Sequence, residues 1–466
     1  MLNFFVSETS SRTIPITPIC QDDFTIWQSS QSERIKNLII NNGFLAKPNT
    51  FCLLTNGDGN LERVLLGLAN KEDFFAFGIL PKALPAGCYY IDAPSFSSGQ
   101  LEHAAIGWGM GHYQFKQYKI LKDFGAKLLC QENYDIARLN SIITSVFLIR
   151  DLVNTPAGDL YPEKLAQVAT SLAKEFNAEL KIIKGNELAT SFPSVYAVGR
   201  GSKREPMLID LSYGDLNAPK IVLVGKGVCF DSGGLQLKPS ASMLLMKKDM
   251  AGAAHVLGLA RMIMDAKLPV NLRVIIPAVE NLISGDSLKP GDIIKTRKGI
   301  TIEVANTDAE GRLILADALA LASEWQPKLI LDFATLTGAA RVALGSDITA
   351  LFANNDKLAE NIITNMLEEQ EAVWRMPLYQ PYLEFFKSEL ADFKNIATSE
   401  SVGAGAVIAA LFLQQFVAEG VEWVHFDINA YNASNRPGKP EGGEACCLRG
   451  IFKYIECHFC GSKSGG

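Results

Sequence analysis

Two stretches of the sequence place charged side chains among glycines and apolar residues. The first stretch runs from Gly225 to Met250 and the second covers residues 305–313. Charges are rare in such surroundings unless they are paired or bind metal. Four carboxylates would balance two divalent cations, which accept oxygen ligands and can together activate a water molecule for hydrolysis. The charged residues in question are Lys226, Asp231, Lys238, Asp249, Asp308, Glu310 and Arg312.

Each of these residues also has an ordinary structural explanation. Asp249 precedes a run of small residues and is typical of a helix cap. Asp308 and Glu310 come just before a helix that we expect to begin at Arg312, where acidic residues complement the helix dipole. Lys238 precedes a proline and is typical of a solvated loop. A phosphate-binding glycine turn is a further alternative for residues 225–234, but the spacing fits no such fingerprint, and Asp231 would repel phosphate.

The second stretch, from Asn306 to Leu313, resembles the signature of the leucyl (cytosol) aminopeptidases. The resemblance extends over roughly residues 151–450, and every charged position of that family's site is occupied. An eight-residue match with a spaced set of charges is far more specific than a single short motif. The upstream residues that belong to the resemblance are Lys226, Asp231, Lys238 and Asp249.

The resemblance implies a site for two divalent metal ions, manganese or zinc. Asp231, Asp308 and Glu310 would hold the more exchangeable ion. Lys226, Asp231, Asp249 and Glu310 would hold the tighter one, so that Asp231 and Glu310 bridge the two. A lysine beside two dications loses its proton readily, which allows Lys226 to serve as a nitrogen ligand.

The resemblance also implies roles for residues that do not bind metal. Lys238 would remain protonated and stabilise the oxyanion of a tetrahedral intermediate. Arg312 would bind a bicarbonate ion that acts as general base. Four further positions match residues that line the substrate site of the family, although Met246 and Leu336 are equally typical of core packing. These four positions are Met246, Asn306, Leu336 and Gly338.

The activity implied is the release of N-terminal amino acids, preferably apolar ones such as leucine, from peptides. The resemblance further implies a homohexamer. One position departs from the family pattern, because Tyr431 stands where some branches have tryptophan. This departure leaves the side-chain preference open.

The pattern of apolar runs predicts an α/β protein with two domains. We expect a smaller N-terminal α/β domain over residues 1–135 and a linking helix over 136–153. The remaining residues, 154–466, would form a larger catalytic domain with a central mixed sheet flanked by helices. Within it, strands at 220–225, 270–276 and 328–333 alternate with helices at 160–176, 250–266 and 312–325. A glycine-rich stretch at 104–111 lacks the spacing of a phosphate loop.

Composition narrows the classes of function. The net charge is −6, with 44 basic and 50 acidic residues and no long basic block, which disfavours nucleic-acid binding. No apolar run is long enough for a membrane span, and the N-terminus does not resemble a signal peptide. Nine scattered cysteines favour reduced thiols and a cytoplasmic location. The five histidines lie far apart, so we expect His255 and His425 to form core hydrogen bonds and not to bind metal.

Two other classes of function remain open. A two-metal phosphoesterase would use similar carboxylates, although it would need additional cations for phosphate. A DNA-binding or regulatory member of the same family would need a basic surface. The C-terminal residues Cys457–Cys460 match nothing in the family, and with Cys446 and Cys447 they lack the second CxxC pair of a zinc site. We expect a frayed terminus there.

Overall fold

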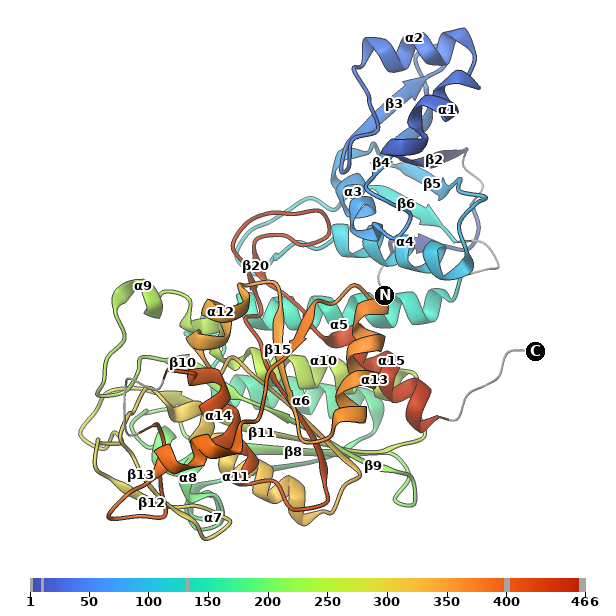
Figure 1. Ribbon diagram of the computed structural model, residues 1–466. Coiled ribbons are helices and arrows are strands. Elements are labelled where there is room, and N and C mark those ends of the chain that lie inside the picture. Colours follow the sequence, from blue (N-terminus) through green and yellow to red (C-terminus); the bar gives the residue numbers. More distant parts are fainter. Residues whose placement is uncertain (1–2, 10–11, 131–133, 398–402, 461–466) are drawn as a thin grey trace. The chain divides into compact units, whose positions relative to one another are not determined.

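The computed structural model describes residues 3–9, 12–130, 134–397 and 403–460 (Figure 1). The chain divides into two compact units. The smaller unit comprises Met1–Phe147 and Asn432–Glu441, and the larger comprises Leu148–Tyr431 and Gly442–Gly466. The helix expected over 136–153 is α5 (Ile136–Asn154). The domain limits at 135 and 153 stay a prediction.

The smaller unit contains a six-stranded sheet in the order β1-β6-β5-β2-β4-β3. Neighbouring strands are parallel except β3 and β4, which are antiparallel. The strands are β1 (Phe5–Val6), β2 (Thr13–Cys20), β3 (Phe51–Thr55), β4 (Leu61–Leu68), β5 (Gly87–Ile91) and β6 (Ala126–Leu129). The helices are α1 (Phe24–Ser29), α2 (Glu33–Asn41), α3 (Leu80–Ala83) and α4 (Ser98–Gly111).

The glycine-rich stretch at 104–111 lies inside helix α4 and forms no loop. A Cβ atom on Gly107 would lie 2.0 Å from the carbonyl oxygen of Phe74. Glycine is therefore required for close packing of the helix against the 74–79 segment, and a phosphate-binding role has no support here.

The larger unit is built on a nine-stranded mixed sheet in the order β16-β15-β18-β14-β9-β11-β8-β7, with β10 pairing to β11. The central strands β18, β14, β9 and β11 are parallel, whereas β8, β7 and β15 join antiparallel. The strands are β7 (Glu179–Lys184), β8 (Met207–Tyr213), β9 (Lys220–Gly225), β10 (Gly227–Asp231), β11 (Asn271–Asn281), β14 (Leu329–Ala334), β15 (Thr349–Ala353), β16 (Val373–Arg375) and β18 (Glu422–Asp427).

Helices flank this sheet, as the sequence predicted. They are α6 (Pro162–Phe176), α7 (Gly185–Ser191), α8 (Pro193–Gly199), α9 (Ser240–Met243), α10 (Ala251–Asp265), α11 (Glu310–Glu324), α12 (Gly338–Leu344), α13 (Asp356–Glu368), α14 (Gly405–Gln414) and α15 (Leu448–Phe459). Short strands β12 (Ile293–Lys295), β13 (Thr301–Glu303) and β17 (Phe393–Lys394) form a separate sheet.

Two local expectations and one structural alternative are wrong. Helix α11 begins at Glu310, so this residue lies in its first turn and not before it. Asp249 does not cap helix α10, whose N-cap is Met250; it lies in a 3-10 turn over Met246–Met250. The segment Cys457–Phe459 is not frayed, because it forms the last turn of α15, while residues 461–466 lie outside the described part.

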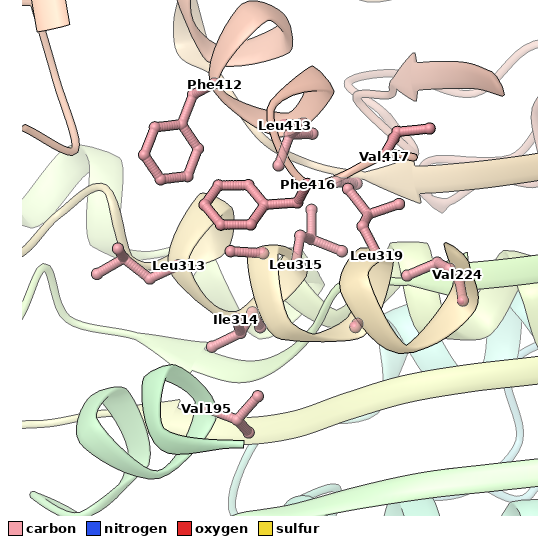
Figure 2. Close-up of a cluster of buried hydrophobic side chains, with 14 of the residues drawn as sticks. Val195, Val224, Leu313, Ile314, Leu315, Leu319, Phe412, Leu413, Phe416 and Val417 are labelled. Carbon is pink, nitrogen blue, oxygen red and sulfur yellow. The ribbon is translucent and has the colours of Figure 1, made fainter. Parts of the chain in front are cut away.

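The core of the larger unit packs around helix α11 (Figure 2). Leu313, Leu315 and Leu319 of this helix are buried against Phe412 and Phe416 from the α14 segment. Burying a large apolar side chain contributes roughly 1.5–3 kcal/mol. This packing fixes the start of α11, and with it the position of Glu310.

The parallel strands of the larger unit place polar residues at one edge of the sheet. Lys226 directly follows β9, Asp231 ends β10, Asn281 ends β11 and Asp427 ends β18. The carboxyl ends of parallel strands meet at the same edge, which is where α/β proteins bind ligands. Among the described residues, none of the helices combines the length and apolar character needed to cross a bilayer.

Replacing Gly252 with alanine tests how closely helix α10 approaches the sheet. The added Cβ would lie 2.0 Å from the carbonyl oxygen of Phe333 and 2.8 Å from the amide nitrogen of Lys226. We expect Gly252→Ala to lower the free energy of unfolding by about 1–3 kcal/mol, because the helix must move away. Thermal unfolding measures this loss. The control is Gly285→Ala, whose Cβ would have no atom within 4 Å; equal stability of the two variants would contradict the packing.

Candidate metal centre

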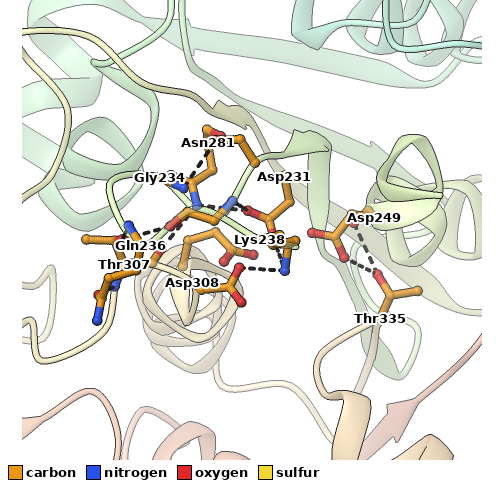
Figure 3. A network of polar contacts seen from close by, with 12 residues as sticks. Asp231, Gly234, Gln236, Lys238, Asp249, Asn281, Thr307, Asp308 and Thr335 are labelled. Atoms are coloured by element: carbon orange, nitrogen blue, oxygen red, sulfur yellow. Dashed lines mark hydrogen bonds and ion pairs between the residues drawn. The ribbon is translucent and has the colours of Figure 1, made fainter. Parts of the chain in front are cut away.

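Four carboxylates and two lysines converge at the carboxyl edge of the sheet. Figure 3 shows Asp231, Asp249 and Asp308 of this cluster together with Lys238. One oxygen each from Asp231, Asp308 and Glu310 lies within 4.8 Å of the others. Asp249 joins them through Lys226, whose Nζ lies 2.8 Å from an Asp249 oxygen and 3.0 Å from Glu310 Oε1. The structure thus brings together residues that are as much as 84 positions apart, from Lys226 to Glu310.

The second lysine bridges the other pair of carboxylates. Lys238 Nζ lies 2.8 Å from Asp231 Oδ2 and 2.5 Å from Asp308 Oδ1. The side chains of Lys238 and Asp308 are 14% and 32% exposed, whereas that of Glu310 is only 2% exposed. The cluster is therefore buried at Glu310 and open to solvent at Asp308.

The crowding of like charges shifts the pKa values of the carboxyl groups. Burial raises the pKa of Asp231 well above its usual range, and the carboxylates of Glu310 and Asp249 add to the effect. Burial also raises the pKa of Asp249 to about 6, although Lys226 opposes this. For Glu310, the two lysines outweigh burial and lower the pKa.

The lysines are held in their charged form by the same carboxylates. Burial alone would lower the pKa of Lys226, but Asp249 and Glu310 outweigh it, so the pKa is raised. The pKa of Lys238 is raised in the same way by Asp231 and Glu310. Two ammonium groups against four carboxylates leave two negative charges uncompensated.

The donor set fits divalent metal ions. Glu310 Oε2 is buried and has no hydrogen-bond partner within the described part of the chain. A buried carboxylate oxygen without a partner is costly, and a cation would satisfy it. Four carboxylates with excess negative charge are ligands that magnesium, manganese or zinc accept.

Helix α11 and Lys226 approach each other closely enough to exclude a side chain between them. A Cβ atom on Gly311 would lie 2.6 Å from Lys226 Cε. Gly311 therefore lets the lysine reach Glu310 from the strand side. This is a packing reason for the glycine inside the second motif.

Several hydrogen-bonding residues that sequence reasoning missed hold the carboxylates in place. Asn281 Nδ2 donates to Asp231 Oδ1 at 2.8 Å and to the carbonyl oxygen of Thr307 at 3.0 Å. Thr335 Oγ1 donates to Asp249 Oδ1 at 2.7 Å. The strand expected over 270–276 continues to Asn281 through its pairing with β10, so the end of the strand was placed too early to reveal Asn281.

A reciprocal pair of hydrogen bonds joins the two charged stretches. The Thr307 amide donates to Gln236 Oε1 at 2.6 Å, and the Gln236 amide donates to Thr307 Oγ1 at 3.0 Å. Thr307 Oγ1 in turn donates to the carbonyl oxygen of Gly233 at 2.7 Å. These bonds fix the loop of Lys238 against the loop of Asp308.

Arg312 is buried near the cluster without a carboxylate partner. Its Nη1 donates to the carbonyl oxygen of Asn395 at 2.6 Å, and no described residue forms an ion pair with it. Burial lowers the pKa of Arg312 to about 10. A buried cation without a counter-ion attracts a small anion.

The four expected substrate positions lie on segments next to the cluster. Met246 begins the 3-10 turn that contains Asp249, and Asn306 Oδ1 accepts the Asp308 amide at 2.7 Å. The Leu336 amide donates to Asp427 Oδ1 at 2.9 Å, and Gly338 begins α12 with nothing within 4 Å of an added Cβ. Leu336 also packs partly against the core.

His255 and His425, which we expected to form hydrogen bonds in the core, both do so. His425 Nδ1 lies 2.5 Å from Asp332 Oδ1, and His255 Nδ1 lies 2.7 Å from the carbonyl oxygen of Ala251.

Comparison with known proteins places this site in a family. Residues 147–451 match the model of the cytosol aminopeptidase family, catalytic domain, and residues 14–130 match the N-terminal domain of M17 aminopeptidases. The chain belongs to the cytosol aminopeptidase family. The match covers every residue of the metal centre, and it confirms the family and the two-domain fold expected from the sequence.

Relatives of the family resemble the chain over different lengths. The probable cytosol aminopeptidase of Chlamydia abortus is 44% identical over 324 residues, which are 68% of this chain and 64% of that protein. The crystal structure of cytosol aminopeptidase from Coxiella burnetii is 48% identical with a TM-score of 0.95, covering 98% of this chain and 100% of that one. The bottromycin maturation enzyme BotP in complex with Mn is 30% identical with a TM-score of 0.86, covering 95% and 98%.

Replacing Asn281 with aspartate tests the electrostatics of the metal-free centre. The new carboxylate would lose both donated hydrogen bonds and face Asp231 in a position where Asn281 is 3% exposed. We expect Asn281→Asp to lower the free energy of unfolding by about 2–4 kcal/mol in the presence of a chelator. Thermal unfolding measures the loss. Asn186→Asp, on the exposed first turn of α7, is the matched control, and an equally small effect of both variants would contradict the account.

Proposed function

We propose that this protein is a metal-dependent aminopeptidase that releases N-terminal amino acids from peptides. The observation that carries the proposal is the carboxylate–lysine cluster, which lies at the ligand-binding edge of the sheet and inside the match to the family's catalytic domain. The aligned curated relatives are named as aminopeptidases.

Two divalent ions, manganese or zinc, would be held by the cluster. Asp231, Asp308 and Glu310 would hold one ion. Lys226, Asp231, Asp249 and Glu310 would hold the other, and Lys226 would have to lose the proton that it carries in the metal-free centre, which the nearby dications favour. When bound, such ions polarise a carbonyl oxygen and activate water at neutral pH. The relative crystallised with Mn supports manganese as one of the candidates.

The need for a free chain end would come from the metal ions. The N-terminal amine of a peptide offers a nitrogen ligand, and it would complete the coordination of one ion on the side where Asp308 is open to solvent. The first peptide bond would then lie beside the cluster. An internal peptide bond has no free amine next to it.

Lys238 is positioned to stabilise a developing oxyanion. Its ammonium group is held between Asp231 and Asp308 and remains partly exposed on the open side. A donor fixed in place before the reaction stabilises charge in the transition state without reorganisation. Lys238 therefore contributes to the rate of the chemical step more than to substrate binding.

Arg312 would bind a small anion, for which bicarbonate is our proposal. Its guanidinium is buried with a backbone carbonyl as its hydrogen-bond partner, and it follows Glu310 by two residues. An anion held there would lie beside the cluster and accept a proton from the attacking water.

Met246, Asn306, Leu336 and Gly338 would line the substrate site. Gly338 leaves open space at its Cβ position, and Met246 and Leu336 are apolar. These features favour an apolar N-terminal side chain such as leucine. We further propose a homohexamer in the cytoplasm.

The decisive assay is hydrolysis of leucine p-nitroanilide by the metal-stripped protein, with manganese or zinc then added back. We expect metal to restore activity, because the carboxylates cannot activate water alone. Asp308→Ala should abolish the restored activity, and Asp265→Ala, at the exposed end of α10, should leave it unchanged. Hydrolysis of p-nitrophenyl phosphate without peptidase activity would contradict the proposal and favour a phosphoesterase. Folded protein that is inactive with every metal and every N-terminal residue would also contradict it.

Lys238→Ala tests the oxyanion role separately. We expect kcat to fall by about a hundredfold or more while KM changes little, because the ammonium acts in the transition state. Lys203→Ala, which replaces an exposed lysine outside the metal centre, serves as the control. A rise in KM at constant kcat would instead assign Lys238 to substrate binding.

A further inference from the structure

Cys446 and His255 form a second reactive cluster outside the metal centre. Cys446 Sγ lies 3.4 Å from His255 Nε2, and the Cys446 amide donates to the same nitrogen at 3.0 Å. The two residues are 191 positions apart and come from helix α10 and the segment that leads into α15. None of the roles proposed above uses either residue.

The imidazole of His255 is fixed in one orientation. Its Nδ1 donates to the carbonyl oxygen of Ala251 at 2.7 Å, one turn earlier in α10. The ring is 1% exposed and stacks on Phe333 with a centroid distance of 6.1 Å. With Nδ1 as donor, the single lone pair of Nε2 faces both the Cys446 amide and the Cys446 thiol, so the thiol proton moves to Nε2 as the amide hydrogen bond is released.

Cys447 completes the cluster from the other side. It is fully buried with a φ of 58°, and it is the N-cap residue of α15. A hydrogen bond from the Cys447 side chain and the adjacent imidazole hold the pKa of Cys446 well below its usual range. The Cys447 thiol itself is a poor nucleophile, because burial raises its pKa.

The charged groups around Cys446 and His255 do not offset the lowering of the pKa of the Cys446 thiol. Glu444 opposes ionisation of Cys446, but its carboxylate is paired with Arg150 at 2.9 Å. Glu371 accepts the amides of Leu448, Arg449 and Gly450 at the start of α15. Lys248 is a cation that interacts electrostatically with Cys446, and its Nζ donates to the carbonyl oxygen and to Oδ1 of Asn429.

Accessibility separates Cys446 from most other thiols of the chain. All nine cysteines are free thiols. Apart from Cys446 and Cys457, the other seven lie in buried or half-buried positions, with no imidazole of the described residues at hydrogen-bond distance. Cys446 is partly exposed, and Cys457 is exposed at the end of α15. A partly exposed thiol with an adjacent base has the environment of a reactive cysteine.

We propose that Cys446 is a site of covalent oxidation by peroxides, with His255 as the positioning base. The thiol proton moves to Nε2, the sulfur attacks one peroxide oxygen, an S–O bond forms and the O–O bond breaks. The leaving hydroxide takes the proton and departs as water. The sulfur is oxidised to a sulfenic acid and the peroxide is reduced, so the step needs no other reactant.

The test follows each cysteine separately by peptide mass mapping. Alkylation by iodoacetamide at pH 6.5 should be at least about tenfold faster at Cys446 than at Cys457, because an ordinary thiol is mostly protonated there. Hydrogen peroxide followed by a 1,3-diketone trap should label Cys446 first. His255→Gln should slow both reactions at Cys446 and leave the rates at Cys457 unchanged. The control is His458→Gln, on the exposed end of α15, which should leave the rates at Cys446 unchanged.

A measurement on the unmodified chain covers the case in which His255→Gln does not fold. Between pH 6 and 8 the alkylation rate of Cys446 should be nearly flat, while that of free N-acetylcysteine in the same solution rises toward the ordinary thiol pKa of about 8.5. Parallel pH profiles for Cys446 and the free thiol would overturn the proposal. So would peroxide labelling that reaches Cys457 before Cys446.

Discussion

The mutual repulsion of four carboxylates is the constraint on which the larger unit depends. Asp231, Asp249, Asp308 and Glu310 stand at one edge of the sheet, three of them almost completely buried. Lys226 and Lys238 each bridge two of these groups. The two lysines reduce the repulsion between the carboxylates but do not neutralise the cluster. The fold holds a concentrated negative charge in place, and that charge is what a cation-dependent site requires.

The surrounding structure holds the four carboxylates close together despite their repulsion. Apolar packing of α11 against the α14 segment fixes Glu310, and the parallel strands fix Lys226 and Asp231. Asn281, Thr307 and Gln236 then tie the loops together with hydrogen bonds. Preorganisation of this kind is established during folding and costs nothing at the moment of reaction.

The sequence was sufficient to predict much of this arrangement. Alternating strands and helices predicted the mixed sheet, because buried parallel strands appear as continuous apolar runs. The charged motifs predicted which carboxylates would meet, because charges among apolar residues need partners. We expected helix α11 to begin at Arg312, two residues after its observed start at Glu310. Periodicity alone does not define helix ends, because they also depend on local packing.

The residues that orient the carboxylates were harder to predict. Asn281 and Thr335 are common residue types in unremarkable sequence contexts, and their importance arises from contacts between segments far apart in the chain. The pairing of Cys446 with His255 belongs to the same class, because 191 positions separate them. Sequence patterns report the local period and spacing, whereas these contacts exist only after the sheet has formed.

The most direct test of the account is to count the manganese ions that the chain binds at equilibrium, by dialysis and elemental analysis. We predict two ions per chain for the unmodified protein and the loss of at least one in Glu310→Gln, which keeps the shape of the side chain but removes its charge. Glu360→Gln, on the exposed face of α13, should bind as the unmodified protein does. A folded chain that binds no manganese or zinc, or a Glu310→Gln variant that binds as many ions as before, would contradict the central claim.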